Sequence, residues 1–86
     1  MKTLEITLKN ETGLHARPAS LLTECVKKFK SEIMVIKDEN TYNPSSMMSL
    51  LSMEASKGTK LNFTIDGPDE SSAFDAIKNL IEREIE

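Results

Sequence analysis

Short stretches of strict apolar–polar alternation constrain the fold of this chain more than any other feature. Residues 3–8, TLEITL, place Leu4, Ile6 and Leu8 on one side of an extended chain and polar residues on the other. The same period of two recurs at 32–37 and at 59–66. Strands that alternate in this way bury only one face, so these segments predict a sheet with one covered and one solvated side.

The segments between these strands change to helical spacing. Residues 16–29 predict a first helix, with Pro18 in the first turn, where a missing N–H costs nothing. Ser45 and Ser46 offer an N-cap for a short second helix, and Asp69 can cap a third. The apolar stripes of the first and third helices comprise Leu21, Leu22, Cys25, Val26 and Phe29, and Ala73, Phe74, Ile77, Leu80, Ile81 and Ile85, respectively.

A polar turn at 38–40 and a short strand at 41–43 complete the pattern, giving the order β-α-β-β-α-β-α. Amphipathic helices must cover the apolar face of the sheet. We therefore expect an α+β open-faced sandwich, in which three helices cover one face of a four-stranded antiparallel sheet. A chain of 86 residues supports one core, so residues 1–86 should form a single domain.

Composition and charge exclude several classes of protein. No apolar run approaches the roughly 20 residues that cross a bilayer, and the N-terminus alternates unlike a signal peptide, so we expect a cytoplasmic protein without membrane insertion. A net charge of −3 argues against nucleic-acid binding. Cys25 is the only cysteine and His15 the only histidine, so neither a disulfide nor a metal site is expected, and no cofactor is implied. Cys25 is expected to be a buried structural thiol.

His15 lies in the heptapeptide G-L-H-A-R-P-A, residues 13–19. Gly13 allows a sharp turn and Pro18 starts a helix, which would place the imidazole at the helix N-terminus. Free N–H groups of Ala16 and Arg17 would then disfavour the imidazolium form and accept an anion. The Arg17 guanidinium could bind phosphate oxygens in fork geometry. A lone loop histidine is more often simply solvated, and only the combination of these residues favours phosphoryl chemistry.

The heptapeptide resembles the active-site signature of the HPr family, the histidine phosphocarriers of the bacterial phosphoenolpyruvate-dependent sugar phosphotransferase system. The resemblance extends over the whole chain and includes the Lys57-Gly58 turn. It implies that His15 accepts phosphate on Nδ1 from enzyme I and passes it to the IIA domain of a sugar permease. It also implies a carrier rather than a catalyst, and no carboxylate other than Glu11 lies near His15 in the sequence as a base.

Two alternatives remain open. One is an HPr-like paralogue in a regulatory or nitrogen-related phosphorelay; the other is a non-transferring binding module on the same fold. Retention of His15, Arg17 and Pro18 argues against the second alternative, because such a module needs no nucleophile.

The short second helix carries the predicted docking surface. Leu50 and Met53 should face the core, whereas three further apolar residues exceed what so short a helix can bury. Adaptable methionines suit a surface that binds several partners. We expect a monomer whose docking surface comprises Met47, Met48, Leu51, Ser20 and Lys27.

The resemblance places a regulatory phosphoserine at Ser46, with HPr kinase/phosphorylase and a catabolite-control regulator as further partners. The chain departs from the family pattern in this region: Pro44 is added, Ser45 replaces a lysine, and Ser49 and Glu54 replace glycines. We therefore expect Ser46 to be a poor phosphorylation site. We also expect the second helix either to continue past Met53 or to end there in a turn without glycine.

Overall fold

The computed structural model describes residues 1–84 except 10, 12 and 15. The predicted order of elements, β-α-β-β-α-β-α, is confirmed. Strands and helices lie at β1 Lys2–Thr7, α1 Ala16–Val26, β2 Glu32–Lys37, β3 Asn40–Tyr42, α2 Met47–Ser52, β4 Lys60–Asp66 and α3 Glu70–Glu84. No helix in these described ranges has both the length and the apolar character needed to cross a membrane.

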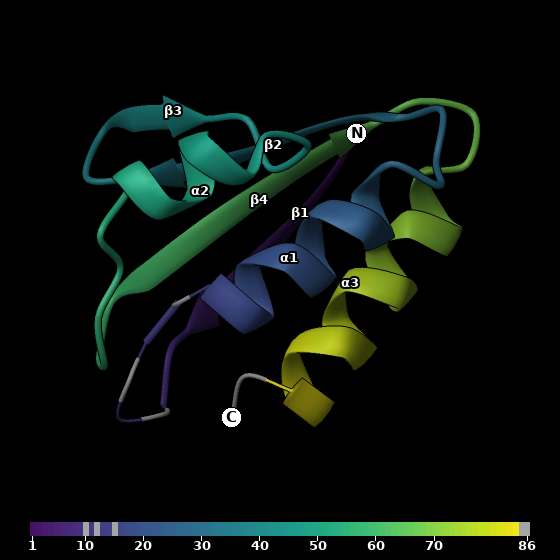
Figure 1. The fold of residues 1–86 in the computed structure, drawn as a ribbon. Coiled ribbons are helices and arrows are strands. Elements are labelled where there is room, and N and C mark those ends of the chain that lie inside the picture. Colours follow the sequence, from purple (N-terminus) through teal and green to yellow (C-terminus); the bar gives the residue numbers. More distant parts are fainter. Residues whose placement is uncertain (10, 12, 15, 85–86) are drawn as a thin grey trace.

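The four strands form one antiparallel sheet in the order β1-β4-β2-β3. Phe63 of the central strand β4 is paired with Leu4 on one side and Val35 on the other, so three inward positions are in register. All three helices lie on the same side of the sheet, α1 beside α3 and α2 near β2 and β3 (Figure 1). The predicted α+β open-faced sandwich is therefore confirmed.

The core lies between this face of the sheet and the helices. Along each strand, every second side chain points into this core. The apolar stripes of the helices pack against these side chains from the opposite side. The buried apolar side chains include Leu4, Ile33, Val35, Leu61, Phe63 and Ile65 from the strands, and Ala19, Leu22, Val26, Leu50, Ala73, Ile77, Leu80 and Ile81 from the helices. Ile85 of the predicted stripe lies outside the described residues.

Several predicted element boundaries are wrong. Helix α1 ends at Val26 and not at Phe29, because the amides of Lys28 and Phe29 donate to carbonyls only three residues back and tighten the chain into a turn. This turn leaves the Lys28 side chain in solvent and lets Phe29 pack against the core. Strand β3 likewise ends at Tyr42 rather than residue 43, since Ser46 and Ser49 engage the Asn43 backbone.

Cys25 is half-buried in the groove between α1 and α3, not buried as predicted. It lies at the edge of the helical stripe, where Lys28 and Arg83 also line the groove. Burial nevertheless raises the pKa of the Cys25 thiol, with both cations partly opposing the effect. The thiol is therefore protonated at neutral pH, which agrees with a packing role.

Asp69 lies directly before α3, at the predicted N-cap position. Its carbonyl accepts the first hydrogen bond of the helix, from Ala73 N. Its carboxylate accepts from the amides of Lys30 at 2.8 Å and Ser31 at 2.9 Å, and also from the Ser31 hydroxyl. The side chain thus joins the start of α3 to the turn between α1 and β2. The Ser31 hydroxyl and the Lys30 amide hold the pKa of Asp69 below its usual range.

Candidate functional site

Helix α1 begins at Ala16, directly after His15 in the chain. Ala16 and Arg17 are exposed in its first turn, whereas Pro18 and Ala19 are buried. The first turn of an α-helix has backbone N–H groups without intrahelical partners, and Pro18 contributes none. The N-terminal end of a helix, a position that generally favours anions, and the exposed Arg17 therefore lie together on the surface. His15 itself lies outside the described residues.

The segment before His15 packs tightly against the segment that follows α2. Gly13 has a positive φ of 61°, and the Leu14 amide donates to the Ala55 carbonyl at 3.0 Å. A Cβ on Gly13 would collide with the Ala55 carbonyl oxygen and lie 2.7 Å from the Ser56 Cα. Leu14 is buried in the core. The backbone on both sides of His15 is therefore anchored to the rest of the fold.

The same two segments are linked further from His15. Gly58 N donates to the Leu8 carbonyl at 2.7 Å in the predicted Lys57-Gly58 turn. The Lys57 ammonium also forms an exposed ion pair with Glu11 at 2.7 Å. Glu11, the one carboxylate near His15 in sequence, is thus engaged with a lysine.

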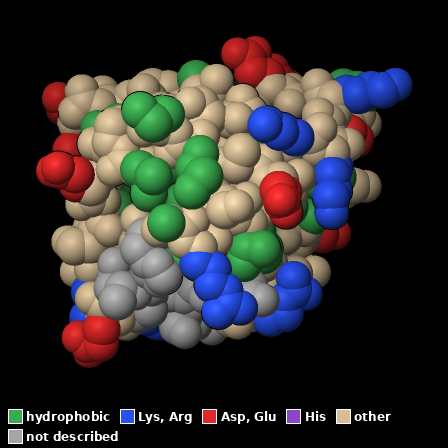
Figure 2. Space-filling model, in the orientation of Figure 1, with side chains coloured by type: hydrophobic (Ala, Val, Ile, Leu, Met, Phe, Trp, Pro, Cys, Tyr) green, Lys and Arg blue, Asp and Glu red, His purple; other side chains and the backbone are tan. Residues whose placement is uncertain are grey.

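Helix α2 has the two faces that its sequence predicts. Ser46 is its N-cap and accepts a hydrogen bond from Ser49 N at 3.3 Å. Leu50 and Met53 are buried, while the side of the helix away from the core carries apolar residues that remain accessible. Among the predicted docking residues, Met48 is 80% exposed and Leu51 37% exposed, Met47 and Ser20 are half-buried, and Lys27 is exposed. Figure 2 shows hydrophobic side chains gathered over α2, with basic side chains further along the same face.

The end of α2 follows the second of the two predicted possibilities. The helix ends at Ser52, and Glu54 makes a turn with a positive φ of 53° and no glycine. Lys37, at the end of β2, donates from Nζ to the Met53 carbonyl at 2.8 Å. Lys37 is not among the site residues predicted from the sequence, although its alternation with Ile33 and Val35 places it on the inward face of β2.

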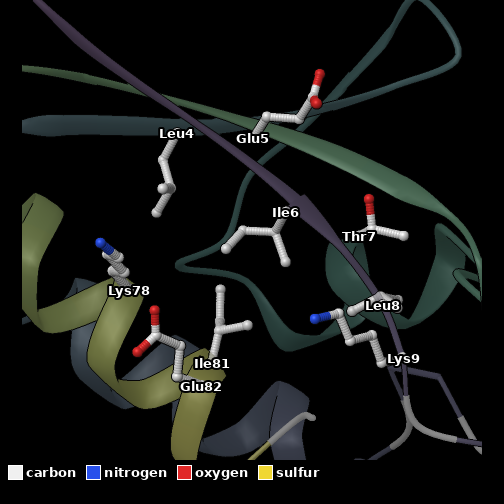
Figure 3. Close-up of a pocket in the computed structure, with 9 residues that line it drawn as sticks. All are labelled: Leu4, Glu5, Ile6, Thr7, Leu8, Lys9, Lys78, Ile81 and Glu82. Atoms are coloured by element: carbon white, nitrogen blue, oxygen red, sulfur yellow. The ribbon is translucent and has the colours of Figure 1, made fainter.

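A groove between β1 and α3 contains none of the predicted site residues. Leu4, Ile6 and Ile81 point toward one another there, with Lys78 and Glu82 on the α3 side (Figure 3). Within the described part of the chain, no group of three metal-ligating side chains comes together. The exposed start of α1, directly after the predicted phosphoryl acceptor, is the candidate site for phosphoryl chemistry.

Comparison with known proteins decides the family. Residues 2–83 match the family model described as "PTS HPr component phosphorylation site". The chain belongs to the HPr family. It is 36% identical over 81 residues to the phosphocarrier protein HPr of Treponema pallidum, covering 94% of this chain and 92% of the relative. The protein is therefore a phosphocarrier of the phosphotransferase system and not a catalyst on its own.

Two solved structures share this fold. The histidine-containing phosphocarrier protein of a mycoplasma has a TM-score of 0.93 and 34% identity, covering 98% of this chain and 97% of the other. Crh, the catabolite repression protein of Bacillus subtilis, has a TM-score of 0.75 and 30% identity, covering 100% and 99%; it is described as a swapped, intertwined dimer.

Proposed function

We propose that His15 carries the phosphoryl group, accepting it from phospho-enzyme I and passing it to the IIA domains of sugar permeases. The observation that supports this proposal best is the start of α1 at the residue after His15, with Arg17 exposed in the first turn. The N–H groups of Ala16 and Arg17 would receive phosphate oxygens, and the guanidinium would add charge-assisted hydrogen bonds.

In the proposed step the lone pair of neutral His15 Nδ1 attacks phosphorus in line. The new N–P bond forms as the bond between phosphorus and the donor's group breaks, and that group keeps the electron pair. The reverse process on a IIA nucleophile releases the imidazole again. The Glu11 carboxylate, the one acidic group near His15 in the sequence, forms an exposed ion pair with Lys57.

The proposed docking surface for both partners consists of Met47, Met48 and Leu51 on α2 and Ser20 and Lys27 on α1. Its support is exposure: Met48 and Leu51 are the accessible apolar residues on this face. Helix α2 contacts α1, so a partner bound to this area would cover part of both helices.

We further propose that residues 1–86 act in the cytoplasm as one monomeric domain. One chain supplies all four strands of the sheet and the three helices that cover it, which supports a single domain. Light scattering at increasing concentration tests the monomeric state, and a mass of twice the chain would favour a swapped dimer of the kind described for Crh.

Incubation with enzyme I and labelled phosphoenolpyruvate tests the central proposal. Wild-type protein should take up one phosphate that is labile to acid and stable to alkali, as expected of a phosphoramidate. His15→Ala should take up none while keeping its thermal midpoint. Uptake by His15→Ala would refute the proposal, and absence of label on the wild type would favour a non-transferring module. Transfer onward to a nitrogen-related IIA in preference to a sugar IIA would identify the paralogue.

Regulation at Ser46 is proposed to be weak. The Ser46 hydroxyl is engaged as the N-cap of α2, and Ser45 is held by Asn43 through both its amide and its hydroxyl. Neither Ser45 nor Pro44 replaces the cation that family members carry at position 45. Incubation with ATP and an HPr kinase should give slow, partial labelling, whereas rapid stoichiometric phosphate on Ser46 would contradict this expectation.

A further inference from the structure

Lys37 occupies an unusual position for a lysine in this fold. It follows Ile33 and Val35 on the inward face of β2, and those two residues are almost fully buried. The Lys37 side chain is therefore directed toward the helices and is half-buried. Its methylene stem lies along the edge of the core, and its ammonium group donates to the Met53 carbonyl at 2.8 Å.

The Met53 carbonyl lies at the C-cap of α2, immediately before a strained residue. Glu54 has a φ of 53°, a left-handed conformation that is disfavoured for a residue with a Cβ. Its amide donates to the Leu51 carbonyl at 3.2 Å, which closes the helix end. A lysine that binds the final carbonyls of a helix stabilises that end. The bond from Lys37 therefore favours the turn at Glu54 over continuation of the helix.

This turn determines the position of Ala55, and Ala55 holds the segment next to His15. The Ala55 carbonyl accepts the Leu14 amide, and Gly13 packs directly against Ala55 and Ser56. Ala55 is itself buried. Direct contacts and three consecutive residues thus connect the end of β2 to the chain just before the phosphoryl acceptor.

We propose that Lys37 is a positioning residue for phosphotransfer, acting through the glycine-free turn at Glu54 and the Ala55 carbonyl on the Gly13–Leu14 segment. The proposal rests on the proposed role of His15. It implies a specific coupling: the requirement for Lys37 exists because residue 54 is not glycine.

Lys37→Met and Glu54→Gly, alone and together, test this coupling. Lys37→Met keeps the apolar stem but removes the donor, so exchange of the Leu14 amide should become about tenfold faster, as for loss of one charge-assisted hydrogen bond. Phosphoryl transfer from enzyme I should slow by a similar factor. Glycine at 54 removes the strain, so Lys37→Met should have much less effect on either measurement in that background.

Lys60→Met is the matched control, because Lys60 is an exposed strand lysine on β4, and it should leave both measurements unchanged. Lys37→Arg keeps a donor and should stay close to wild type. Lys37→Gln loses charge and reach, and should give an intermediate effect even if Lys37→Met does not fold.

Three outcomes would overturn the proposal: wild-type Leu14 exchange in Lys37→Met and Lys37→Gln, a lower thermal midpoint as the only change, or equal effects with glutamate and glycine at 54. Exchange of the Leu14 amide is measured without phosphate. A failure of the His15 proposal would therefore appear as unlabelled wild-type protein with the exchange effect intact.

Discussion

Substitution of Gly13 by alanine tests how firmly the segment before His15 is anchored. Two effects act at this position. A φ of 61° is unfavourable for alanine, and the added Cβ would collide with the Ala55 carbonyl oxygen and lie 2.7 Å from the Ser56 Cα. Both obstacles are backbone atoms, which cannot rotate away as the end of a flexible side chain could.

The expected loss of stability follows from these contacts. The left-handed conformation costs alanine about 1 kcal/mol. Relief of the collision must separate residue 13 from residues 55–56, which breaks the hydrogen bond from Leu14 to Ala55 and costs about 1 kcal/mol. Residual overpacking adds roughly 1 kcal/mol. A total of about 3 kcal/mol corresponds to a fall in Tm of roughly 12–24 °C for a domain of this size.

Gly58→Ala provides the matched control. Gly58 also has a positive φ, of 89°, but a Cβ there would meet nothing within 4 Å. Only the conformational effect remains, about 1 kcal/mol or a fall in Tm of roughly 4–8 °C. Urea and thermal unfolding followed by circular dichroism measure both variants. Equal losses would show that the packing of Gly13 against Ala55 and Ser56 adds nothing, and the anchoring argument would fail.

Three further predictions concern single side chains. Arg17→Lys keeps the charge but loses the planar fork, so phosphotransfer should slow, and Arg17→Glu should slow it far more; equal rates for wild type and Arg17→Glu would exclude a role in phosphate binding. Met48→Glu should weaken binding to enzyme I in a titration and leave Tm nearly unchanged, because the side chain is 80% exposed, whereas a sharp fall in Tm would place Met48 in the core. The folded-state pKa of Asp69 lies below the ordinary value of an aspartate, so the stabilising contribution of this side chain is complete above that ordinary pKa and disappears as the pH falls through the folded pKa. Asp69→Asn should flatten this part of the acid unfolding curve, and an unchanged curve would contradict the assignment.

The order of elements, the fold class and the two faces of α2 could be predicted because they depend on local periodicity. Alternation assigned Leu61, Phe63 and Ile65 to the core, and all three are buried there. The exposed side of α2 could be predicted because this short helix carries more apolar residues than it can bury on one side. Helix ends were less predictable, since the α1 terminus at Val26 depends on how Phe29 packs beyond it.

The interactions that escaped prediction join residues distant in sequence. Asp69 was assigned to its own helix, but its carboxylate binds amides 38 and 39 positions away. Lys37 and Met53 are separated by 16 positions. A helix cap can be predicted from neighbouring residues, whereas a bond between two elements requires their spatial arrangement. His15 was predicted from its neighbours in the chain, and its own placement lies outside the described residues.

The candidate site is exposed, unlike an enzyme pocket, and it is held in place by buried residues next to it in the chain. A carrier must present one phosphoryl group first to a donor and then to an acceptor, so the acceptor residue has to remain reachable from solvent. Ala16 and Arg17 are exposed, whereas their neighbours Leu14, Pro18 and Ala19 are buried and hold this part of the backbone against the core. The exposure of Ala16 and Arg17 therefore suits the proposed role of His15, in which a phosphoryl group is received from one protein and passed to another.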